Sequence, residues 1–276
     1  MSSNSFIRNF YKGLKERAVS LFQNPYKEVS INWLKLKYYK HLPAGKLRTH
    51  NLFGRAFFFY NPKELLHAFD EIFIEQVYKQ QLSSQPYIID CGANIGLSVI
   101  YMKHNYPKAK ILAFEPDEIN FDLLKRNMQS FAYSDVIIKN EAVWNENTTL
   151  QFSSVGLMSS KITTDYNQDA KQVKAVRLRD LLTSEIDFLK LDIEGAEFVV
   201  LNDINDKLHF VKNMFVEYHG IFEQNNEVAE LLSLINKSGF SFYIKEATCV
   251  YKTPFFRTGN TEKLYDVQLN IFCFRA

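Results

Sequence analysis

The chain has 276 residues, of which 46% are hydrophobic and 23% charged, and its formal net charge is +2. These are ordinary globular values that exclude global disorder, and the length suits one large domain or one domain with an N-terminal extension. The charge is uneven: residues 1–50 carry ten Lys/Arg against two Asp/Glu, a balance of +8, and the remainder carries −6. A basic arm meets phosphates, anionic lipid or an acidic glycan, or it forms the solvated face of a helix.

The first predicted element is an amphipathic basic helix over residues 6–22, where apolar side chains recur at helical spacing. Such a helix docks on its own domain, or it lies on a membrane surface in contact with lipid or glycolipid. No stretch has transmembrane length, and residues 1–20 are too polar and basic for a signal peptide. The three cysteines lack metal-type spacing, which is typical of buried thiols in a reducing compartment. We therefore expect a cytoplasmic protein.

Residues 51–60, rich in Phe, predict a strand or a hairpin arm. A helix is predicted to begin at Pro62, with Asn61 as its N-cap. The polar stretch at residues 83–86, which ends in proline, marks the predicted boundary between a first part, residues 1–84, and a second part, residues 85–276.

From residue 87 onward, short apolar runs alternate with helical patterns. The predicted strands lie at residues 87–91, 110–116, 136–143, 173–178, 186–191, 213–218, 240–251 and 267–274. The predicted helices lie at residues 97–104, 120–130, 195–201 and 227–237, and a polar stretch at 144–170 contains a small hairpin arm near residue 150. This alternation predicts an α/β fold with a doubly wound, mostly parallel sheet.

The loop after the first of these strands, residues 92–96, predicts a ligand site. Gly92 and Gly96 allow a sharp turn and a close approach to a helix N-terminus, and Asp90 precedes them at the strand end. Glu115 ends the next strand, where a carboxylate accepts both hydroxyls of a ribose. The loop and the acid together predict a nucleoside-containing cofactor, although a strand-end acid also serves as a helix cap.

Further ionisable residues follow two later strands. Asp192 and Glu194 follow the strand at residues 186–191, and they cap the next helix, form part of an active site, or do both. Glu217 and His219 end the strand after that. Because the carboxyl ends of parallel strands meet at one edge of a sheet, we expect all these groups to lie near Asp90 and Glu115.

From about Tyr87 to Glu217, the chain resembles the FkbM family of S-adenosylmethionine-dependent methyltransferases. The resemblance is carried by residues 89–96 (IDCGANIG), 114–117 (FEPD), 140–143 (NEAV) and, most specifically, 188–197 (FLKLDIEGAE). It implies a class I methyltransferase sheet with an antiparallel edge strand and a helical or mixed N-terminal extension. Residues 1–84 would then be a basic, aromatic-rich docking or substrate region, and residues 85–276 the cofactor-binding domain.

The resemblance also implies roles for individual residues toward S-adenosylmethionine. Gly92, Asn94 and Gly96 would surround the methionine part, Glu115 would hold the ribose, and Glu141 and Ala142 would lie beside the adenine. Asp90, at the strand end, would face the same crevice and also bind the cofactor. Asp192 would lie near the amino acid end or the reacting methyl group. Members of this family methylate hydroxyl groups of sugars or polyketides, so we expect a small-molecule or saccharide acceptor.

Methyl transfer to a hydroxyl gains from a base that takes its proton. His219 is the group best suited to titrate near neutrality, with Asp192, Glu194 and Glu217 as alternatives. We expect no metal, because nothing in the residue spacing requires one, although Asp192, Glu217 and His219 could ligate a divalent cation.

Other classes of function fit less well. A nicotinamide-dependent oxidoreductase would need a G-x-G-x-x-G loop, whereas the glycines here are spaced G-x-x-x-G. An RNA methyltransferase or nucleic-acid-binding module is suggested by the basic N-terminal part with Trp33, Tyr38 and Tyr39. The second part has no Asn-Pro-Pro-Tyr-type base pocket, so we expect no nucleic acid. A non-catalytic interaction protein would not need the set of carboxylates.

Overall fold

The computed structural model describes residues 24–155, 159–162, 171–257 and 264–275, so the helix predicted over residues 6–22 lies outside the described residues. The chain divides into two compact units, residues 1–77 and 78–276, and the division predicted at residues 84–85 falls a few residues later. Within the described ranges, no helix combines the length and the apolar character needed to cross a membrane.

The first unit is a small helical and hairpin structure. It contains η1 (Pro25–Lys27), α2 (Trp33–His41), β1 (Arg48–Leu52), β2 (Arg55–Phe59), α3 (Pro62–Phe69) and the π-helical turn η2 (Asp70–Ile74). The antiparallel pair β1–β2 confirms the predicted hairpin arm, which is β2, although residues 51–52 of the predicted segment belong to β1. Asn61 caps α3 by accepting the Lys63 N–H, as predicted. Aromatic side chains of both β2 and α3 are fully buried.

The second unit is built on a seven-stranded sheet in the order β12-β13-β11-β10-β3-β4-β5. Its strands are β3 (Tyr87–Cys91), β4 (Lys110–Phe114), β5 (Val136–Lys139), β10 (Ile186–Leu191), β11 (Val211–Gly220), β12 (Ser241–Glu246) and β13 (Val267–Phe274). β3, β4, β5, β10 and β11 are parallel, whereas β13 is antiparallel to both of its neighbours. The antiparallel strand therefore lies one place in from the edge, because β12 pairs outside it.

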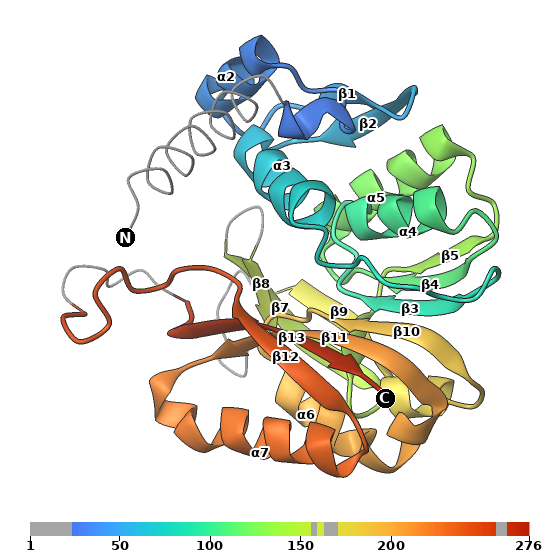
Figure 1. Cartoon of the computed structure of the whole chain (residues 1–276), viewed down its shortest axis with the longest axis vertical. Coiled ribbons are helices and arrows are strands. Elements are labelled where there is room, and N and C mark those ends of the chain that lie inside the picture. Colours follow the sequence, from blue (N-terminus) through green and yellow to red (C-terminus); the bar gives the residue numbers. More distant parts are fainter. Residues whose placement is uncertain (1–23, 156–158, 163–170, 258–263, 276) are drawn as a thin grey trace, which may run out of the picture. The chain divides into compact units, whose positions relative to one another are not determined.

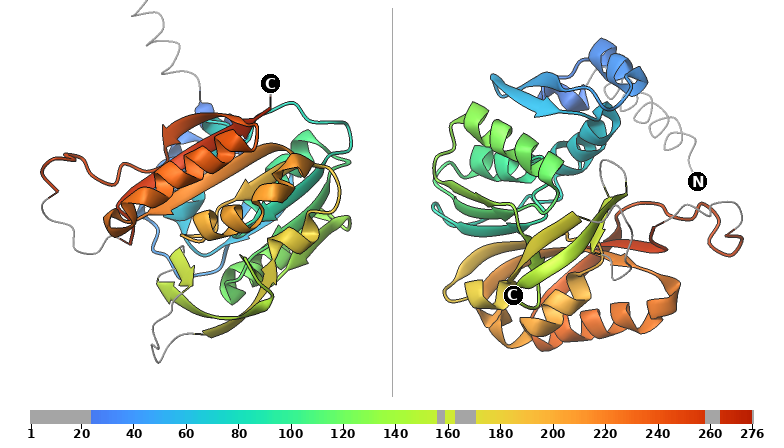
Figure 2. Two further views of the ribbon diagram at one scale, coloured as in Figure 1. Left: turned by 90° about the horizontal axis from the view of Figure 1, so that it is seen from below. Right: turned by 180° about the vertical axis from the view of Figure 1, so that it is seen from behind.

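Helices cover both faces of this sheet. α4 (Leu97–Asn105) and α5 (Glu118–Phe131) lie on one face, and α6 (Glu197–Asp203) and α7 (Asn225–Lys237) lie on the other (Figure 1). The view from below in Figure 2 shows α6 and α7 lying across the β10–β13 part of the sheet. Apolar side chains of β3, β10, β11, α6 and α7 form one buried cluster between these layers. The doubly wound α/β fold predicted from the sequence is confirmed.

A four-stranded sheet in the order β6-β9-β7-β8 follows β5 along the chain. It consists of β6 (Ala142–Trp144), β7 (Thr148–Val155), β8 (Ser159–Ile162) and β9 (Lys171–Arg177). The prediction of a single strand over residues 136–143 is wrong, because these residues form β5 and β6, which belong to different sheets. Asn140 lies at the break and donates its side-chain N–H groups to the carbonyls of Glu115 and Pro116, which ends β5. β7 confirms the predicted hairpin arm.

Short helical turns complete this unit, namely η3 (Leu178–Leu181), η4 (Asn205–Phe210) and η5 (Phe222–Gln224). The helix predicted over residues 195–201 instead begins at Glu197 and ends at Asp203. The delay arises because Glu194 and Gly195 both have left-handed backbone conformations, with φ of +55° and +96°, which are incompatible with a right-handed helix. Residues 192–196 therefore form an irregular turn that follows β10.

Candidate active site

The loop between β3 and α4 lies against the end of β10. Gly92 has a φ of +87°, and a Cβ at this position would overlap the backbone carbonyl oxygen of Asp192. The N–H groups of Gly92 and Ala93 both donate to the Phe114 carbonyl, at 3.0 and 2.8 Å. Gly92 is therefore required for contact between strand ends, whereas the sequence suggested that it leaves room for a ligand. Gly96, with a φ of +95°, begins α4.

A buried lysine that sequence reasoning gave no role joins two of the predicted acids. Lys190 Nζ donates to the Gly92 carbonyl at 2.6 Å and lies 3.3 Å from Asp90 Oδ1 and 3.1 Å from Asp192 Oδ2. Burial lowers its pKa, but the carboxylates of Asp192 and Asp90 outweigh this effect and hold the pKa well above its ordinary value. Asp90 is itself buried and accepts the Ser98 hydroxyl at 2.5 Å. Lys190 thus fixes the ends of β3 and β10 together.

Glu115 is buried at the end of β4, next to the glycine loop. Its Oε2 accepts the Asn94 N–H at 2.8 Å, and its Oε1 accepts the Asp117 N–H at 2.9 Å. Burial raises the pKa of Glu115 to about 8, although these two backbone hydrogen bonds lower it. Each carboxylate oxygen has two lone pairs, so Glu115 can still accept hydrogen bonds from a ligand.

Glu141 and Ala142 lie where the chain passes from one sheet to the other. Ala142 is buried at the start of β6, and Glu141 forms an ion pair of 2.6 Å with the exposed Lys174 on β9. A hollow of about 290 Å³ lies beside them, lined by residues 116–118, Asn140 and residues 171–174. It is adjacent to the strand end that carries Glu115.

The residues predicted after β10 and β11 form one cluster. One ligand-type atom from each of Asp192, Glu194 and His219 lies within 4.8 Å of the other two. The His219 side chain is buried, and its Nε2 lies 3.6 Å from Glu194 Oε2 and 3.7 Å from Glu217 Oε1. The parallel pairing of β10 with β11 brings these residues together, as the sequence predicted.

Glu197, which also received no role from the sequence, orients this cluster. It is fully buried in the first turn of α6, and it accepts the N–H groups of Ile193 and Gly195 at 3.0 and 3.1 Å. Its Oε1 lies 3.2 Å from His219 Nδ1. The Tyr265 hydroxyl donates to the Glu194 carbonyl at 2.7 Å and holds the other side of the turn. A fully buried acid in a helix is the signal that could have identified Glu197, but burial is not visible in the sequence.

The carboxylates determine the charge of His219. Burial lowers the pKa of His219, but Glu197, Glu194 and Glu217 raise it to about 10, so the imidazole is protonated at neutral pH in this environment. Burial raises the pKa of Glu194 to about 7, against the lowering effect of His219. The titration near neutrality that the sequence suggested for His219 is therefore not what its surroundings favour.

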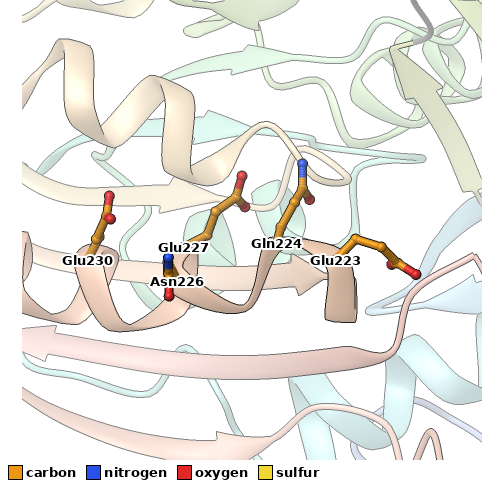
Figure 3. Close-up of a pocket in the computed structure, with 5 residues that line it drawn as sticks. All are labelled: Glu223, Gln224, Asn226, Glu227 and Glu230. Carbon is orange, nitrogen blue, oxygen red and sulfur yellow. The ribbon is translucent and has the colours of Figure 1, made fainter.

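A second hollow, of about 380 Å³, lies at the start of α7 and does not include these residues. Figure 3 shows its five lining side chains, which come from η5 and α7: Glu223, Gln224, Asn226, Glu227 and Glu230. It contains none of the predicted site residues.

The strand order, with an antiparallel strand inserted next to β11, defines a class I methyltransferase fold, and the carboxyl ends of β3, β4, β10 and β11 carry its ionisable cluster. The sequence model of the FkbM methyltransferase domain family matches residues 90–242. The chain belongs to this family of methyltransferases and is a methyltransferase.

Several relatives are similar over most of their length. The chain is 30% identical over 216 residues to methyltransferase sdnD of Sordaria araneosa, covering 64% of this chain and 82% of that protein. It is 28% identical to methyltransferase 1 of Beauveria bassiana, covering 66% and 82%. It is 23% identical to the 31-O-demethyl-FK506 methyltransferase FkbM of Streptomyces tacrolimicus, covering 72% and 87%. A crystal structure of methyltransferase FkbM from Methylobacillus flagellatus aligns with a TM-score of 0.47 at 14% identity, over 70% of this chain and 44% of that one.

Proposed function

We propose that this protein is an S-adenosylmethionine-dependent O-methyltransferase whose acceptor is a hydroxyl group of a saccharide or a related secondary metabolite. The observation that carries the proposal is the juxtaposition of two groups of residues at one sheet edge. The glycine loop with Glu115 lies at the ends of β3 and β4, and the cluster around His219 lies at the ends of β10 and β11.

The residues present fit the cofactor. The buried carboxylate of Glu115 has further lone pairs that can accept the ribose hydroxyls. The Asn94 N–H donates to this carboxylate, which places the glycine loop next to the proposed ribose position. The hollow beside Asn140 has polar walls and suits an adenine next to Glu141 and Ala142. Asp192, at the end of β10, offers negative charge to the cationic methionine end. When bound, the cofactor supplies a methyl group already activated on a sulfonium.

The remaining work falls to residues of the chain. The acceptor hydroxyl must be held in line with the methyl group, and positioning of this kind can lower a barrier by ~7–11 kcal/mol. We assign the proton transfer to a carboxylate of this cluster: Glu194 or Glu217, beside the protonated His219, takes the hydroxyl proton, which typically adds ~10²–10⁴-fold. Burial of His219 and Glu197 keeps water away from this part of the site.

Two observations support a hydroxyl acceptor. The relative from Streptomyces tacrolimicus is named for 31-O-demethyl-FK506, and that name specifies an oxygen that lacks its methyl group. The first unit of the present chain also carries exposed aromatic side chains, Trp33 and Tyr38, with flat apolar faces of the kind that contact sugar rings. Selection of the acceptor by the residues before the cofactor domain is part of the proposal.

The proposal is tested first by calorimetric binding of S-adenosylhomocysteine. Measured above about pH 8, where Glu115 is ionised, Glu115→Gln should weaken binding at least tenfold, because each charge-assisted hydrogen bond to the ribose contributes ~1.5–3 kcal/mol. Glu115→Ala would leave the backbone N–H groups of Asn94 and Asp117 without their acceptor, whereas Gln can still accept one of them, so Gln is the milder change. Glu230→Gln, at an exposed acid of the separate hollow at α7, is the control and should bind normally.

The acceptor class is tested by methyl transfer from labelled cofactor to hydroxylated saccharides and polyketides, with RNA as the comparison. Label should appear as a methyl ether on a hydroxyl. Transfer to RNA or to a nitrogen would contradict the proposed acceptor, and equal binding by wild type and Glu115→Gln would contradict the cofactor site.

A further inference from the structure

The cluster at the ends of β10 and β11 has the donor set of a metal centre. Asp192 and Glu194 each contribute a carboxylate oxygen and His219 an imidazole nitrogen, all within 4.8 Å of one another. A single ion at the centre of such a triangle lies within the usual ~2.0–2.2 Å of all three atoms after small side-chain adjustments. A fourth carboxylate, that of Glu217, lies on the same side of the imidazole.

The imidazole is held as metal-binding histidines are held. Glu197 Oε1 lies 3.2 Å from Nδ1, which fixes the ring orientation and directs Nε2 toward Glu194 and Glu217. The distances from Nε2 to those carboxylates, 3.6 and 3.7 Å, are longer than a hydrogen bond but leave space for an ion between the groups. A carboxylate bonded to the far nitrogen of a ligating histidine is the common outer-shell arrangement in metal sites.

The charges around His219 favour a cation. Four carboxylates gather there, from Asp192, Glu194, Glu197 and Glu217, and three of them lie within 3.7 Å of the ring nitrogens. Lys190 contributes one positive charge beside Asp192. Negative charge exceeds positive charge within this set even when the imidazole is protonated, and a bound divalent ion would relieve the repulsion.

We propose that Asp192, Glu194 and His219 bind one divalent first-row transition-metal ion, with Glu197 positioning the histidine. The ion takes the place of the proton on His219 Nε2, which is released to solvent on binding. A nitrogen ligand favours Mn²⁺, Fe²⁺ or Zn²⁺ over Mg²⁺ and Ca²⁺, which prefer oxygen. The three ligands leave coordination positions for a substrate oxygen. Its catalytic role rests on the proposed function: the acceptor hydroxyl binds the ion and releases its proton to Glu217, its oxygen bonds to the methyl carbon, and the carbon–sulfur bond breaks with its electron pair remaining on sulfur.

Manganese is the probe for the test, because bound and free Mn²⁺ differ in their electron paramagnetic resonance signals. Chelator-treated full-length protein should bind one Mn²⁺ per chain, Zn²⁺ should displace it, and Mg²⁺ should compete poorly. Electron spin echo modulation should show one coupled imidazole nitrogen. Absence of stoichiometric binding, or of the nitrogen coupling, would overturn the proposal.

The variants assign the site. His219→Gln should remove the nitrogen coupling and weaken Mn²⁺ binding by at least about tenfold, and Glu194→Gln, on an irregular turn, should also weaken it. Glu197→Gln should weaken binding by about 10–100-fold while the nitrogen coupling remains, as expected for a positioning residue. Glu230→Gln removes the same charge from the acidic hollow at α7 and should bind like wild type. Equal binding by all four variants would place the ion elsewhere.

Binding of S-adenosylhomocysteine is measured on the same samples. If the protein binds S-adenosylhomocysteine but not Mn²⁺, the metal proposal fails and the proposed function stands. If it binds Mn²⁺ with the histidine signature but not S-adenosylhomocysteine, the metal site stands and the proposed function fails.

Discussion

Gly92 shows how one missing Cβ permits the site to form. Gly92→Ala should destabilise the protein by several kcal/mol, because the new Cβ overlaps the Asp192 carbonyl. Gly45 has the same φ of +87°, but a Cβ there would meet no atom of the described residues within 4 Å. Gly45→Ala should therefore cost only the left-handed backbone strain of about 1–2 kcal/mol. Urea unfolding measures the loss in free energy of unfolding for both variants. Equal losses would show that the backbone at Asp192 moves away from the new Cβ without cost.

Removal of the buried Lys190 should be costly, because this residue holds two carboxylates together. Lys190→Met leaves the carboxylates of Asp90 and Asp192 near one another without their cation, which should lower the free energy of unfolding by about 3–5 kcal/mol. Lys171→Met, at an exposed ion pair with Glu118, should cost less than about 1 kcal/mol. Thermal or urea unfolding measures both. A small effect at Lys190 would mean that water replaces its ammonium group.

The positions of single residues were predictable where topology alone decides them. Asp192, Glu194, Glu217 and His219 follow adjacent parallel strands, so their meeting could be predicted from the strand pattern. The role of Glu197 could not, because it depends on the left-handed turn at Glu194, and a left-handed conformation at a non-glycine residue carries little signal in a sequence.

At the scale of elements, strand β1 carries a buried histidine that should make the first unit sensitive to acid. His50 Nε2–H donates to the Val29 carbonyl at 2.6 Å, and the Tyr39 hydroxyl lies 3.2 Å from Nδ1. Burial lowers the pKa of His50 to about 4. The hydrogen bond to the Val29 carbonyl raises the pKa, whereas the positive charge of Lys35 lowers it further. The neutral form is therefore the one that the folded unit accommodates.

The sign of the pH effect follows from linkage. Between pH 6.5 and 4 the unfolded chain binds a proton at His50 that the folded unit does not, so stability is full above pH 6.5 and falls as the pH decreases toward 4. With allowance for solvent screening, the loss should be about 1–2 kcal/mol. His50→Gln retains a donor for Val29 but cannot titrate. Urea unfolding at about pH 7 and about pH 5, on either side of the ordinary histidine pKa, should show a smaller pH effect in this variant than in wild type, and an equal effect would contradict the assignment.

Elements with strong local patterns were predictable, whereas their pairing often was not. The strands of the seven-stranded sheet read as short apolar runs, and Asn61 marked the start of α3. The break between β5 and β6 depends on hydrogen bonds from Asn140 to residues on another strand end, so a continuous strand was predicted there. The parallel pairing of β6 with β9 joins residues far apart in sequence and has no local signal.

At the scale of the molecule, the division into two units predicts that cofactor binding resides in one of them. Every proposed cofactor residue lies within residues 78–276, which have their own sheet and core. A fragment of residues 78–276 should bind S-adenosylhomocysteine with nearly the affinity of the full chain but lose transfer to the acceptor. Calorimetry and a methyl-transfer assay test this. A folded fragment without affinity would show that the first unit contributes to the cofactor site.

The position of β13 has a consequence for how the protein is made. β11, which carries Glu217 and His219, pairs with β13 in the register Glu217↔Asn270 and His219↔Gln268. A ribosome completes β11 well before β13, so the nascent chain exposes an unpaired apolar edge at the future site until β13 emerges. A premature stop within β13 should therefore favour aggregation over a soluble inactive enzyme, because β11 would keep this edge unpaired.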